Sequence, residues 1–430
     1  MQDRYFLKAA FIALGFALLS SGGASARNEA PHYAEQFLHG FCKSHDCIDG
    51  RQPSSGVIKD ASGNLYGATS EGGKFGRGLV YKLTPNADHS KYAETVLHHF
   101  CYQGCPDGEL PQGELIMDID GNLYGVASEG GACIPLSQEC GVVFKLAHSG
   151  DIWTYSVLYI FCDTGENTCP GGSTPLTGLT YVGQAAGALW DKSSPLFGTA
   201  SRGGQDNTGV VFKLANNGGT WTETAIHSFT ASSLPNALTM DAAGNIYGTT
   251  RDGGKYDGGL MYMLAHGTWT QIVFKAFCAL NNCSDGAHPM GRLLVDAAGN
   301  IFGTAYDGGS HAEGLVFERT AGGTYKKLYD FKSGIDSPRD SERPAAGLIM
   351  DSSGNLFGTT SAGGVYNPNY CQGDGYTCGT VFELSKNGDG TWSETPLHQF
   401  WKKTSDDGFG PRTPLILDNY YAGMIFELKP

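Results

Sequence analysis

One segment recurs along the chain at intervals of about 50 to 73 residues. It reads Asp-Ala-Ser-Gly-Asn-Leu-Tyr-Gly at 60–67 and Asp-Ile-Asp-Gly-Asn-Leu-Tyr-Gly at 118–125. Further copies begin at Asp241, Asp296 and Asp351, and a sixth copy keeps only residues 194–198. A Gly-Gly pair follows each copy. A repeat of this length constrains the fold strongly, because each unit has to be one small module that packs against its neighbours.

Each unit contains four strand-like segments. After the Gly-Gly pair, apolar residues alternate, as at 79–83, and the next segment ends in Leu-x-x-Phe, as at 97–100. An apolar run such as 115–117 precedes the Asp-containing copy. Alternation with a period of two predicts strands. Four short strands joined by Gly- and Asp-rich turns are typical of a β-propeller blade, whereas a sandwich would not repeat its sequence.

The number of these segments predicts an all-β fold, a seven-bladed β-propeller of mostly four-stranded blades. The chain starts with a lone fourth strand at 33–41 and ends on a third strand at 424–428. We therefore expect the N-terminal strand to complete the last blade, which removes the free edges of an open ring. The last unit runs from 415–418 directly into its third strand. We expect this final blade to be short, within a single domain over residues 27–430.

Residues 1–26 have the features of a secretory signal peptide. Arg4 and Lys8 precede an apolar run at 9–19, and Ala-Ser-Ala at 24–26 is a small-x-small cleavage site. The apolar run is too short to span a bilayer, and no later stretch is apolar enough to do so. We expect a secreted, periplasmic or cell-surface protein with no transmembrane segment after the signal peptide is removed.

The net charge of −14 at pH 7 bears on the partners. An acidic surface repels nucleic acid and anionic lipid, so we expect no nucleic-acid partner. The same charge permits binding of cations or basic ligands.

The twelve cysteines form six pairs that are close in sequence. The pairs are Cys42/Cys47, Cys101/Cys105, Cys133/Cys140, Cys162/Cys169, Cys278/Cys283 and Cys371/Cys378. Behind a signal peptide, this pattern indicates six local disulfides. Zinc sites are the alternative, but they usually combine C-x2-C pairs, and here three to six residues separate the cysteines.

All six pairs fall in loops that an up-and-down blade places on one face, which we call the disulfide face. These loops follow either the second or the fourth strand of a blade. Loops on a rigid scaffold often bind ligands, which suggests a ligand-binding face. The alternative is that long exposed loops need disulfides only for protection against unfolding and proteolysis.

Acidic residues also gather in these loops. The candidates are Glu71, Glu129, Asp252, Asp307, Asp107 and Asp285. Several carboxylates on one face form a possible site for Ca2+ or a basic ligand. The alternative is turn chemistry, in which Asp accepts bonds from backbone N–H groups and Gly adopts positive φ. No other cofactor is expected.

The repeated G-N-L-Y-G-T-T-x-x-G-G followed by G-x-V-F-x-L resembles the Gloeo/Verruco repeat of exported bacterial proteins of the "choice-of-anchor" GloVer type. The resemblance covers nearly all of residues 33–430 and rests on six copies of a long motif. It implies an extracellular or cell-surface repeat protein. It supplies no catalytic residues that could be transferred to this chain.

Catalytic motifs were sought outside the repeat. The sequence has neither a G-x-S-x-G elbow nor an H-E-x-x-H motif. Paired carboxylates for glycoside chemistry remain open, because they need only proximity in space. The loop at 184–194 carries Trp190 and Asp191, a combination that suits sugar binding, but an insertion is the simpler interpretation.

These observations predict a monomeric, non-enzymatic binding or interaction module. Its expected partner is a polysaccharide or a cell-surface or extracellular protein. The alternative is an extracellular carbohydrate-active enzyme, a hydrolase or lyase, on the same scaffold. Such an enzyme should show an unrepeated acid, base or nucleophile at the mouth of the central channel.

Overall fold

The computed structural model describes most of the repeat region. The described residues are 38–42, 46–53, 55–131, 140–162, 169–230, 233–332, 341–364, 378–400, 411, 413–418 and 423–425. The chain divides into Met1–His32 and a compact unit Tyr33–Pro430, which contains every described strand. The predicted signal peptide at 1–26 lies outside the described residues.

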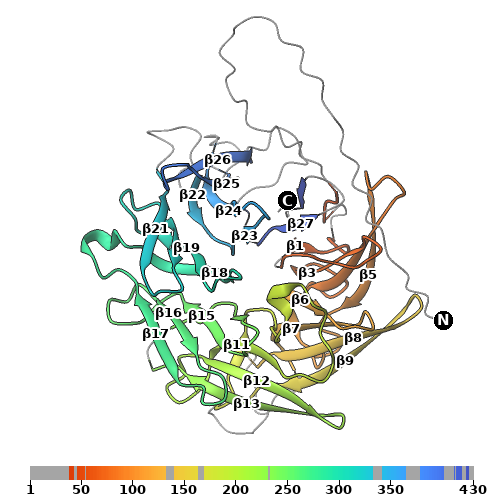
Figure 1. The fold of residues 1–430 in the computed structure, drawn as a ribbon. Helices are drawn as coiled ribbons and strands as arrows, with labels where there is room; N and C mark the ends of the chain where they lie inside the picture. The colour runs from red at the N-terminus through yellow and green to blue at the C-terminus, as the bar shows by residue number, and fades with distance from the viewer. Residues whose placement is uncertain are drawn as a thin grey trace, which may run out of the picture. The chain divides into compact units, whose positions relative to one another are not determined.

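Six antiparallel sheets, each with four strand positions, follow one another along the compact unit (Figure 1). The first contains β1 (Arg51–Pro53), β2 (Ile58–Lys59), β3 (Leu65–Glu71), β4 (Leu79–Pro85) and β5 (Tyr92–His99). The second contains β6 (Glu109–Met117), β7 (Leu123–Glu129), β8 (Val142–Ser149) and β9 (Ile152–Ile160). The third contains β10 (Ser173–Pro175), β11 (Leu196–Arg202), β12 (Val210–Asn217) and β13 (Thr220–Ser228), with the 3-10 helix η1 (Gln184–Ala186) between β10 and β11.

The remaining sheets repeat this order. The fourth contains β14 (Thr239–Met240), β15 (Ile246–Thr250), β16 (Leu260–Leu264) and β17 (Gln271–Ala276), followed by the 3-10 helix η2 (Asn281–Cys283). The fifth contains β18 (Ala287–Val295), β19 (Ile301–Asp307), β20 (Leu315–Arg319) and β21 (Tyr325–Asp330). The sixth contains β22 (Ser341–Pro344), β23 (Ile349–Met350), β24 (Leu356–Gly363), β25 (Thr380–Lys386) and β26 (Trp392–Gln399). In the first and sixth sheets the first position is divided into two short strands, β1 and β2 or β22 and β23.

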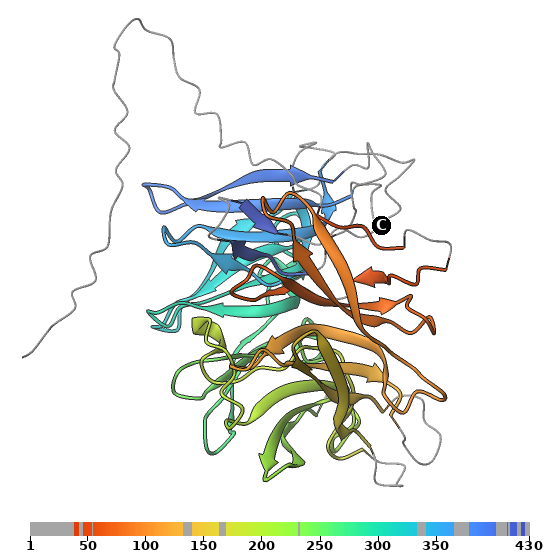
Figure 2. The same ribbon diagram turned by 90° about the vertical axis from the view of Figure 1, so that its right-hand side faces the viewer.

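These sheets are the blades of a β-propeller, as the repeat predicts. Figure 1 shows the fourth strands, such as β9 and β21, at the periphery, and the first strands, such as β6 and β18, toward the centre. The strands twist along their length, which is clear in the side view (Figure 2). In every blade the pairing of the third and fourth strands shifts register just before a buried aromatic residue, for example between Val143 and Phe144. Such bulges increase the local twist of a strand pair.

The core lies between neighbouring blades. The Phe that follows the fourth strand of each of the first five blades, and Phe41 before the first blade, meet the aromatic residue of the next third strand at centroid distances of 4.8 to 5.4 Å. The pairs are Phe41–Tyr81, Phe100–Phe144, Phe161–Phe212, Phe229–Tyr262, Phe277–Phe317 and Phe331–Phe382. Buried tilted and edge-on aromatic pairs stabilise beyond the area they bury. The conserved spacing of the repeat thus places one aromatic pair in each described seam.

The structure corrects the predicted number of blades. The described residues form six four-stranded blades, and the seventh repeat contributes only a two-stranded sheet, β27 (Ile416–Asp418) and β28 (Gly423–Ile425). The physical reason is that this repeat lacks a second strand, so its first strand pairs directly with its last.

Residues near both ends of the compact unit lie between the sixth and first blades. Leu415 packs in the cluster of Phe357 and Phe400 of the sixth blade, and Ile416 packs against the cluster of the first blade. Leu38 and Phe41 pack against that same cluster. The described part of the predicted N-terminal strand, 38–41, is not in a strand. Within the described part of the chain, no helix is both long and apolar enough to cross a membrane.

Candidate functional site

Four of the six predicted disulfides are confirmed. They are Cys42–Cys47, Cys101–Cys105, Cys162–Cys169 and Cys278–Cys283. Cys133 and Cys371, the partners expected for Cys140 and Cys378, lie outside the described residues.

The disulfide loops are hydrogen-bonded to the Gly-Gly corners. The carbonyl of Cys105 accepts bonds from the N–H groups of Gly108 (3.0 Å) and Gly131 (2.8 Å). Cys283 accepts equivalent bonds from Gly286 and Gly309. The loops after the fourth strands and those after the second strands therefore share one face, the disulfide face predicted from the topology.

Four of the six acidic candidates lie at strand ends on this face. Glu71 forms an ion pair with Arg51. Glu129 lies opposite Glu109 in the β6–β7 pair. The Nδ1 atom of His288 lies 2.8 Å from Asp307, and its Nε2 atom lies 3.8 Å from Asp252.

The other two candidates, Asp107 and Asp285, are turn residues. Asp107 accepts a bond from the backbone N–H of Tyr102 (3.1 Å) and lies 2.9 Å from His98 Nε2. Asp285 is buried and pairs with Lys275. Burial raises the pKa of Asp285, but the bonds from Lys275 and from backbone N–H groups outweigh burial, so the net pKa falls below its ordinary value. Both acids organise the loop that contains a disulfide.

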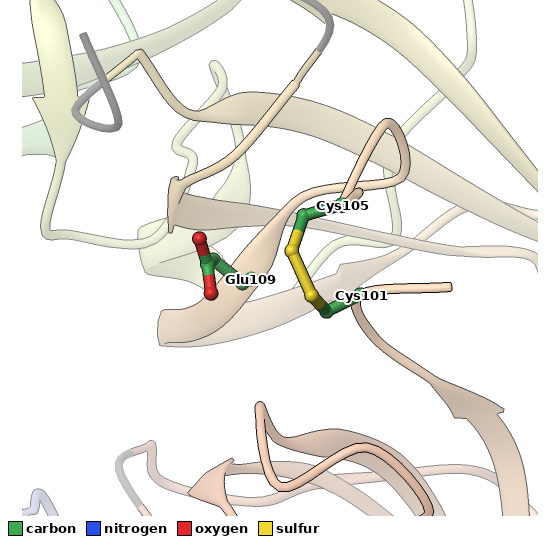
Figure 3. Close-up of side chains that lie close together, drawn as sticks. All are labelled: Cys101, Cys105 and Glu109. Carbon is green, nitrogen blue, oxygen red and sulfur yellow. A yellow bond between two sulfur atoms is a disulfide. The ribbon is translucent and has the colours of Figure 1, made fainter. Parts of the chain in front are cut away.

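Among the described residues, two groups of neighbouring side chains are of types that can bind a metal ion. Cys101, Cys105 and Glu109 lie together, but the two cysteines are joined in a disulfide and offer no thiolate (Figure 3). Glu109 is instead paired with Arg77, whose Nε atom is 3.0 Å away. Burial is the largest influence on Glu109, and its pKa is raised although Arg77 opposes this.

The second group is His39, Asp49 and Glu94, whose ligand atoms lie within 4.8 Å of one another. The His39 Nε2 and Glu94 Oε2 atoms are 3.0 Å apart. In the seam between the first and second blades, His98 also contacts a carboxylate, that of Asp107 in the following loop. The group therefore follows the polar pattern of a blade seam.

Glu223 on β13 is another acid buried in a seam between blades, and its burial should make the stability of the fold depend on pH. Burial raises its pKa from 4.5 to about 7, and a hydrogen bond with Tyr159 opposes this only in part. A raised carboxyl pKa adds no penalty below pH 4.5, where the group is protonated in both states. It destabilises the fold increasingly between pH 4.5 and about 7, and the full penalty persists above that range.

We expect Glu223→Gln to raise the melting temperature above pH 7 and to leave it unchanged near pH 4. The measurement is thermal unfolding of both proteins from pH 4 to pH 8. Asp151→Asn, at an exposed acid, is the control and should show no such pH-dependent gain. A lower melting temperature for Glu223→Gln at pH 8 would contradict the expected sign.

The loop of the third blade is not a sugar platform. Trp190 is 1% exposed and packs edge-on against Tyr124, with ring centroids 4.8 Å apart. Asp191 accepts bonds from the backbone N–H groups of Ser193 and Ser194. The bond from Ser194 is the largest cause of a pKa lowered to about 2. Both residues hold the inserted loop in place.

The disulfide face carries exposed aromatic residues that the sequence analysis missed. Phe75 is 37% exposed and Tyr102 is 55% exposed, and their ring centroids are 5.7 Å apart. Lys74 Nζ lies 5.5 Å from the centroid of Phe75. The fourth blade repeats the arrangement, with Lys255 Nζ 5.2 Å from the ring of the exposed Tyr256. The signal in the sequence is a Lys-aromatic pair directly after Gly-Gly in these two repeats.

The inner strands enclose two adjoining cavities of about 520 Å³ and about 180 Å³. Glu114 and Arg292 line both cavities, with Glu114 Oε2 and Arg292 Nη2 3.3 Å apart. They are the only charged side chains among the described lining residues. Neither residue belongs to a motif that is predicted from the sequence to be functional.

A model of the Gloeobacter/Verrucomicrobia repeat matches residues 29–234 and 234–426. The chain belongs to this repeat family. The predicted resemblance is thereby confirmed over nearly the whole chain. No curated protein matches this chain.

Several solved structures are similar to this member of the family. An ulvan lyase from a new family of polysaccharide lyases is 12% identical, with a TM-score of 0.47 over 86% of this chain and 87% of that one. A protein from Lactobacillus plantarum is 13% identical, with a TM-score of 0.44 over 79% and 82%. A puromycin-hydrolysing peptidase from Mycobacterium tuberculosis is 10% identical, with a TM-score of 0.39 over 85% of this chain and 56% of that one. This chain thus matches little more than half of that peptidase, and such values say nothing about activity.

Proposed function

We propose that this protein is an exported, non-enzymatic binding module whose disulfide face binds a polysaccharide. The exposed pair of Phe75 and Tyr102 carries the proposal. Large apolar side chains that remain in water on a soluble protein mark interaction sites when they form a patch. Flat aromatic rings suit the apolar faces of sugar rings, and the polar edge of Tyr suits their hydroxyl groups.

The loop of Tyr102 is organised before any ligand binds. The Cys101–Cys105 disulfide closes the loop, and Asp107 accepts a bond from the backbone N–H of Tyr102. A preorganised binding loop loses less conformational entropy when it binds. Rigid display of an aromatic side chain favours binding over mere protection of the loop.

A long polymer suits the repetition of this arrangement. The corner of the fourth blade presents Tyr256 beside Lys255, and Leu280 of the following disulfide loop is 60% exposed. Two similar contacts on one polymer raise the apparent affinity through effective concentration. Because the chain has a net charge of −14, we propose a neutral polysaccharide rather than a polyanion.

Further features support an exported binding protein. Four disulfides fit an oxidising compartment, and with the predicted signal peptide at 1–26 they support a secreted, periplasmic or cell-surface location. The proposed binding uses no cofactor, and Ca2+ bound by acids of the same face is the alternative. A glycoside hydrolase of the common type would use two carboxylates, whereas the described lining of the channel offers only Glu114.

The proposal is tested by retention of the purified protein on a panel of insoluble neutral polysaccharides. We expect Phe75→Ala/Tyr102→Ala to bind about tenfold or more weakly, since each aromatic contact contributes roughly 1 kcal/mol. Ile152→Ala removes a 71% exposed apolar side chain from a hairpin outside the disulfide face, and it should bind as the unaltered protein does.

If the double variant is retained as strongly as the unaltered protein, the disulfide face is not the polysaccharide-binding site. Retention on polyanions alone would contradict the choice of a neutral polymer. Capture of a purified cell-surface protein in place of any polysaccharide would replace the proposed ligand class.

A further inference from the structure

The seven repeats all contribute to the lining of the central channel. The smaller cavity is lined by residues 55–56, 113–114, 176–178, 236–237, 291–292, 345–347 and 413–414. Residues 113–114 and 291–292 lie in the middle of β6 and β18, and residues 55–56 and 345–347 lie between the two short inner strands of their blades. The larger cavity reaches the last residues of inner strands, Val295 and Met350, toward the opposite face. Glu114 and Arg292 line both cavities and therefore lie where the two meet.

Repeat symmetry is broken at this point in the channel. The positions equivalent to Glu114 and Arg292 in the other repeats are Gly56, Gly178, Ala237, Gly347 and Pro414. Small residues suffice to build the channel at five of the seven positions. The two charged side chains are therefore not required by the propeller, although they come from the second and fifth blades and meet at 3.3 Å.

A second departure from the repeat reaches the same cavity. Only the third blade has an insertion between its first and second strands, and its residues Gln184, Ala185 and Gly187 line the larger cavity. Thr180 donates a hydrogen bond to Gln184 Oε1 at 2.6 Å, which holds the side chain at the channel wall. Two independent departures from an otherwise regular repeat thus meet in one place. Convergence of this kind indicates a built site rather than drift.

Arg292 retains capacity to bind a ligand. Its Nη2 atom approaches Glu114, and 23% of the Arg292 side-chain surface remains exposed. A guanidinium group carries five N–H donors in a planar fork that matches a carboxylate. A carboxylate that reaches Arg292 from the channel would therefore form charge-assisted hydrogen bonds with it.

The rest of the larger cavity is mostly apolar. Met240, Leu294, Met350 and Ile416 lie along its wall. Its volume of about 520 Å³ falls in the range of small-molecule pockets, which are typically apolar with a few well-placed polar groups. Such a wall suits an aliphatic or aromatic body.

We propose that the central channel binds a small zwitterion with an apolar body, of the amino-acid class. Its carboxylate pairs with Arg292, its ammonium group pairs with Glu114, and its side chain lies in the larger cavity. A simple anion would meet repulsion from Glu114, and a simple cation would meet repulsion from Arg292. A zwitterion replaces one ion pair inside the protein by two with the ligand and leaves no charge unmatched. This site is separate from the disulfide face and does not depend on polysaccharide binding.

The competing explanation is a structural strut that ties the second blade to the fifth. The two explanations differ in what the channel recognises. A strut predicts that loss of either charge lowers stability and that no ligand is bound. A zwitterion site predicts selective binding that depends on both charges.

The experiment measures binding to the purified full chain by calorimetry and by thermal shift. The probes are L-leucine, L-phenylalanine and L-proline, and for the amino acid that binds best, its methyl ester and its deaminated acid. The ester lacks the carboxylate and the deaminated acid lacks the ammonium group. We expect at least one amino acid to bind and both of its analogues to bind about tenfold or more weakly, because each lacks one charge-assisted pair.

Two variants assign the charges. Arg292→Met keeps the length of the side chain and should abolish binding of the amino acid. Glu114→Gln should remove the preference for the amino acid over its deaminated acid. Arg292→Lys keeps the charge without the planar fork, and partial binding by this variant shows that the channel is intact if Arg292→Met is poorly folded.

Three results would overturn the proposal. One is that none of the three amino acids binds the unaltered protein. Another is that an analogue binds as tightly as its parent amino acid. The third is that folded Arg292→Met binds the amino acid as the unaltered protein does.

Discussion

Replacing Phe317 by alanine is expected to lower the free energy of unfolding by about 3 to 5 kcal/mol, as for other large buried aromatic residues. Phe317 is fully buried on β20, in the seam between the fourth and fifth blades. Its ring centroid lies 5.3 Å from that of Phe277 in the preceding blade and 5.6 Å from that of Tyr325 in its own blade. Gly303 leaves the space for this ring, because a Cβ atom there would lie 2.5 Å from Phe317 Cζ.

The surroundings of Phe317 cannot easily close a cavity. The ring is held between two blades, so collapse around an alanine would require movement of one sheet against the next. Denaturant unfolding of the variant and of the unaltered protein measures the loss. Val273→Ala on the outer strand β17 is the control; Val273 is 50% exposed, and the change should stay within about 0.5 kcal/mol. A loss for Phe317→Ala as small as that of the control would contradict the inter-blade core.

The second large effect is expected from Asp118→Ala, at the turn between β6 and β7. Asp118 is fully buried and accepts four hydrogen bonds. Its Oδ1 atom accepts from the N–H groups of Asp120 and Asn122, and its Oδ2 atom accepts from Asn122 Nδ2 (2.8 Å) and the Tyr124 hydroxyl (2.9 Å). Alanine leaves these buried donors without an acceptor, and each such donor costs about 1 to 3 kcal/mol. We therefore expect a loss of about 3 kcal/mol or more from those costs together.

The repeat supplies a matched control for this change. Asp296 occupies the same turn in the fifth blade, but it is half-buried, and Phe302 replaces the Tyr that would donate a hydroxyl. Asp296→Ala should therefore cost clearly less than Asp118→Ala in the same denaturant experiment. Equal losses would show that the turn itself, and not burial of the acid, determines the effect.

The strands and the disulfides were largely predictable because they depend on local patterns. The alternation at 79–83 lies inside β4, and the motif at 118–125 spans the turn and the first three residues of β7. Four close cysteine pairs form local disulfides, since a separation of four to seven residues keeps the two sulfur atoms near each other. Features of this kind need no knowledge of distant contacts.

The predicted count of seven was wrong because it included the short last repeat as a blade, whereas that repeat forms only a two-stranded sheet in the described residues. Residues 423–425 pair directly with β27, and only residues 419–422 lie between the two strands in the sequence. For Gly125, the sequence predicts a close contact but does not identify the group that makes it. A glycine inside a strand indicates close approach of another group. The group is the Phe144 ring of the same blade, 2.6 Å from the position of an added Cβ atom.

The channel pair could not be found by searching for local motifs. Glu114 and Arg292 lie in different blades, and only closure of the ring brings them to 3.3 Å. The sequence does contain a signal for this pair, because five of the seven repeats have Gly, Ala or Pro at the position where these two have a charged residue. For Trp190 the simpler interpretation, an insertion, agrees with the structure, because its ring is buried between the second and third blades and is not displayed for a sugar.

The most direct test of the proposed function incubates the purified protein with neutral polysaccharides and measures retention and release of new sugar ends together. We predict retention that depends on Phe75 and Tyr102, with no new sugar ends. Release of sugar ends by the purified protein would contradict a non-enzymatic module, and absence of retention on every polymer would contradict polysaccharide binding by the disulfide face.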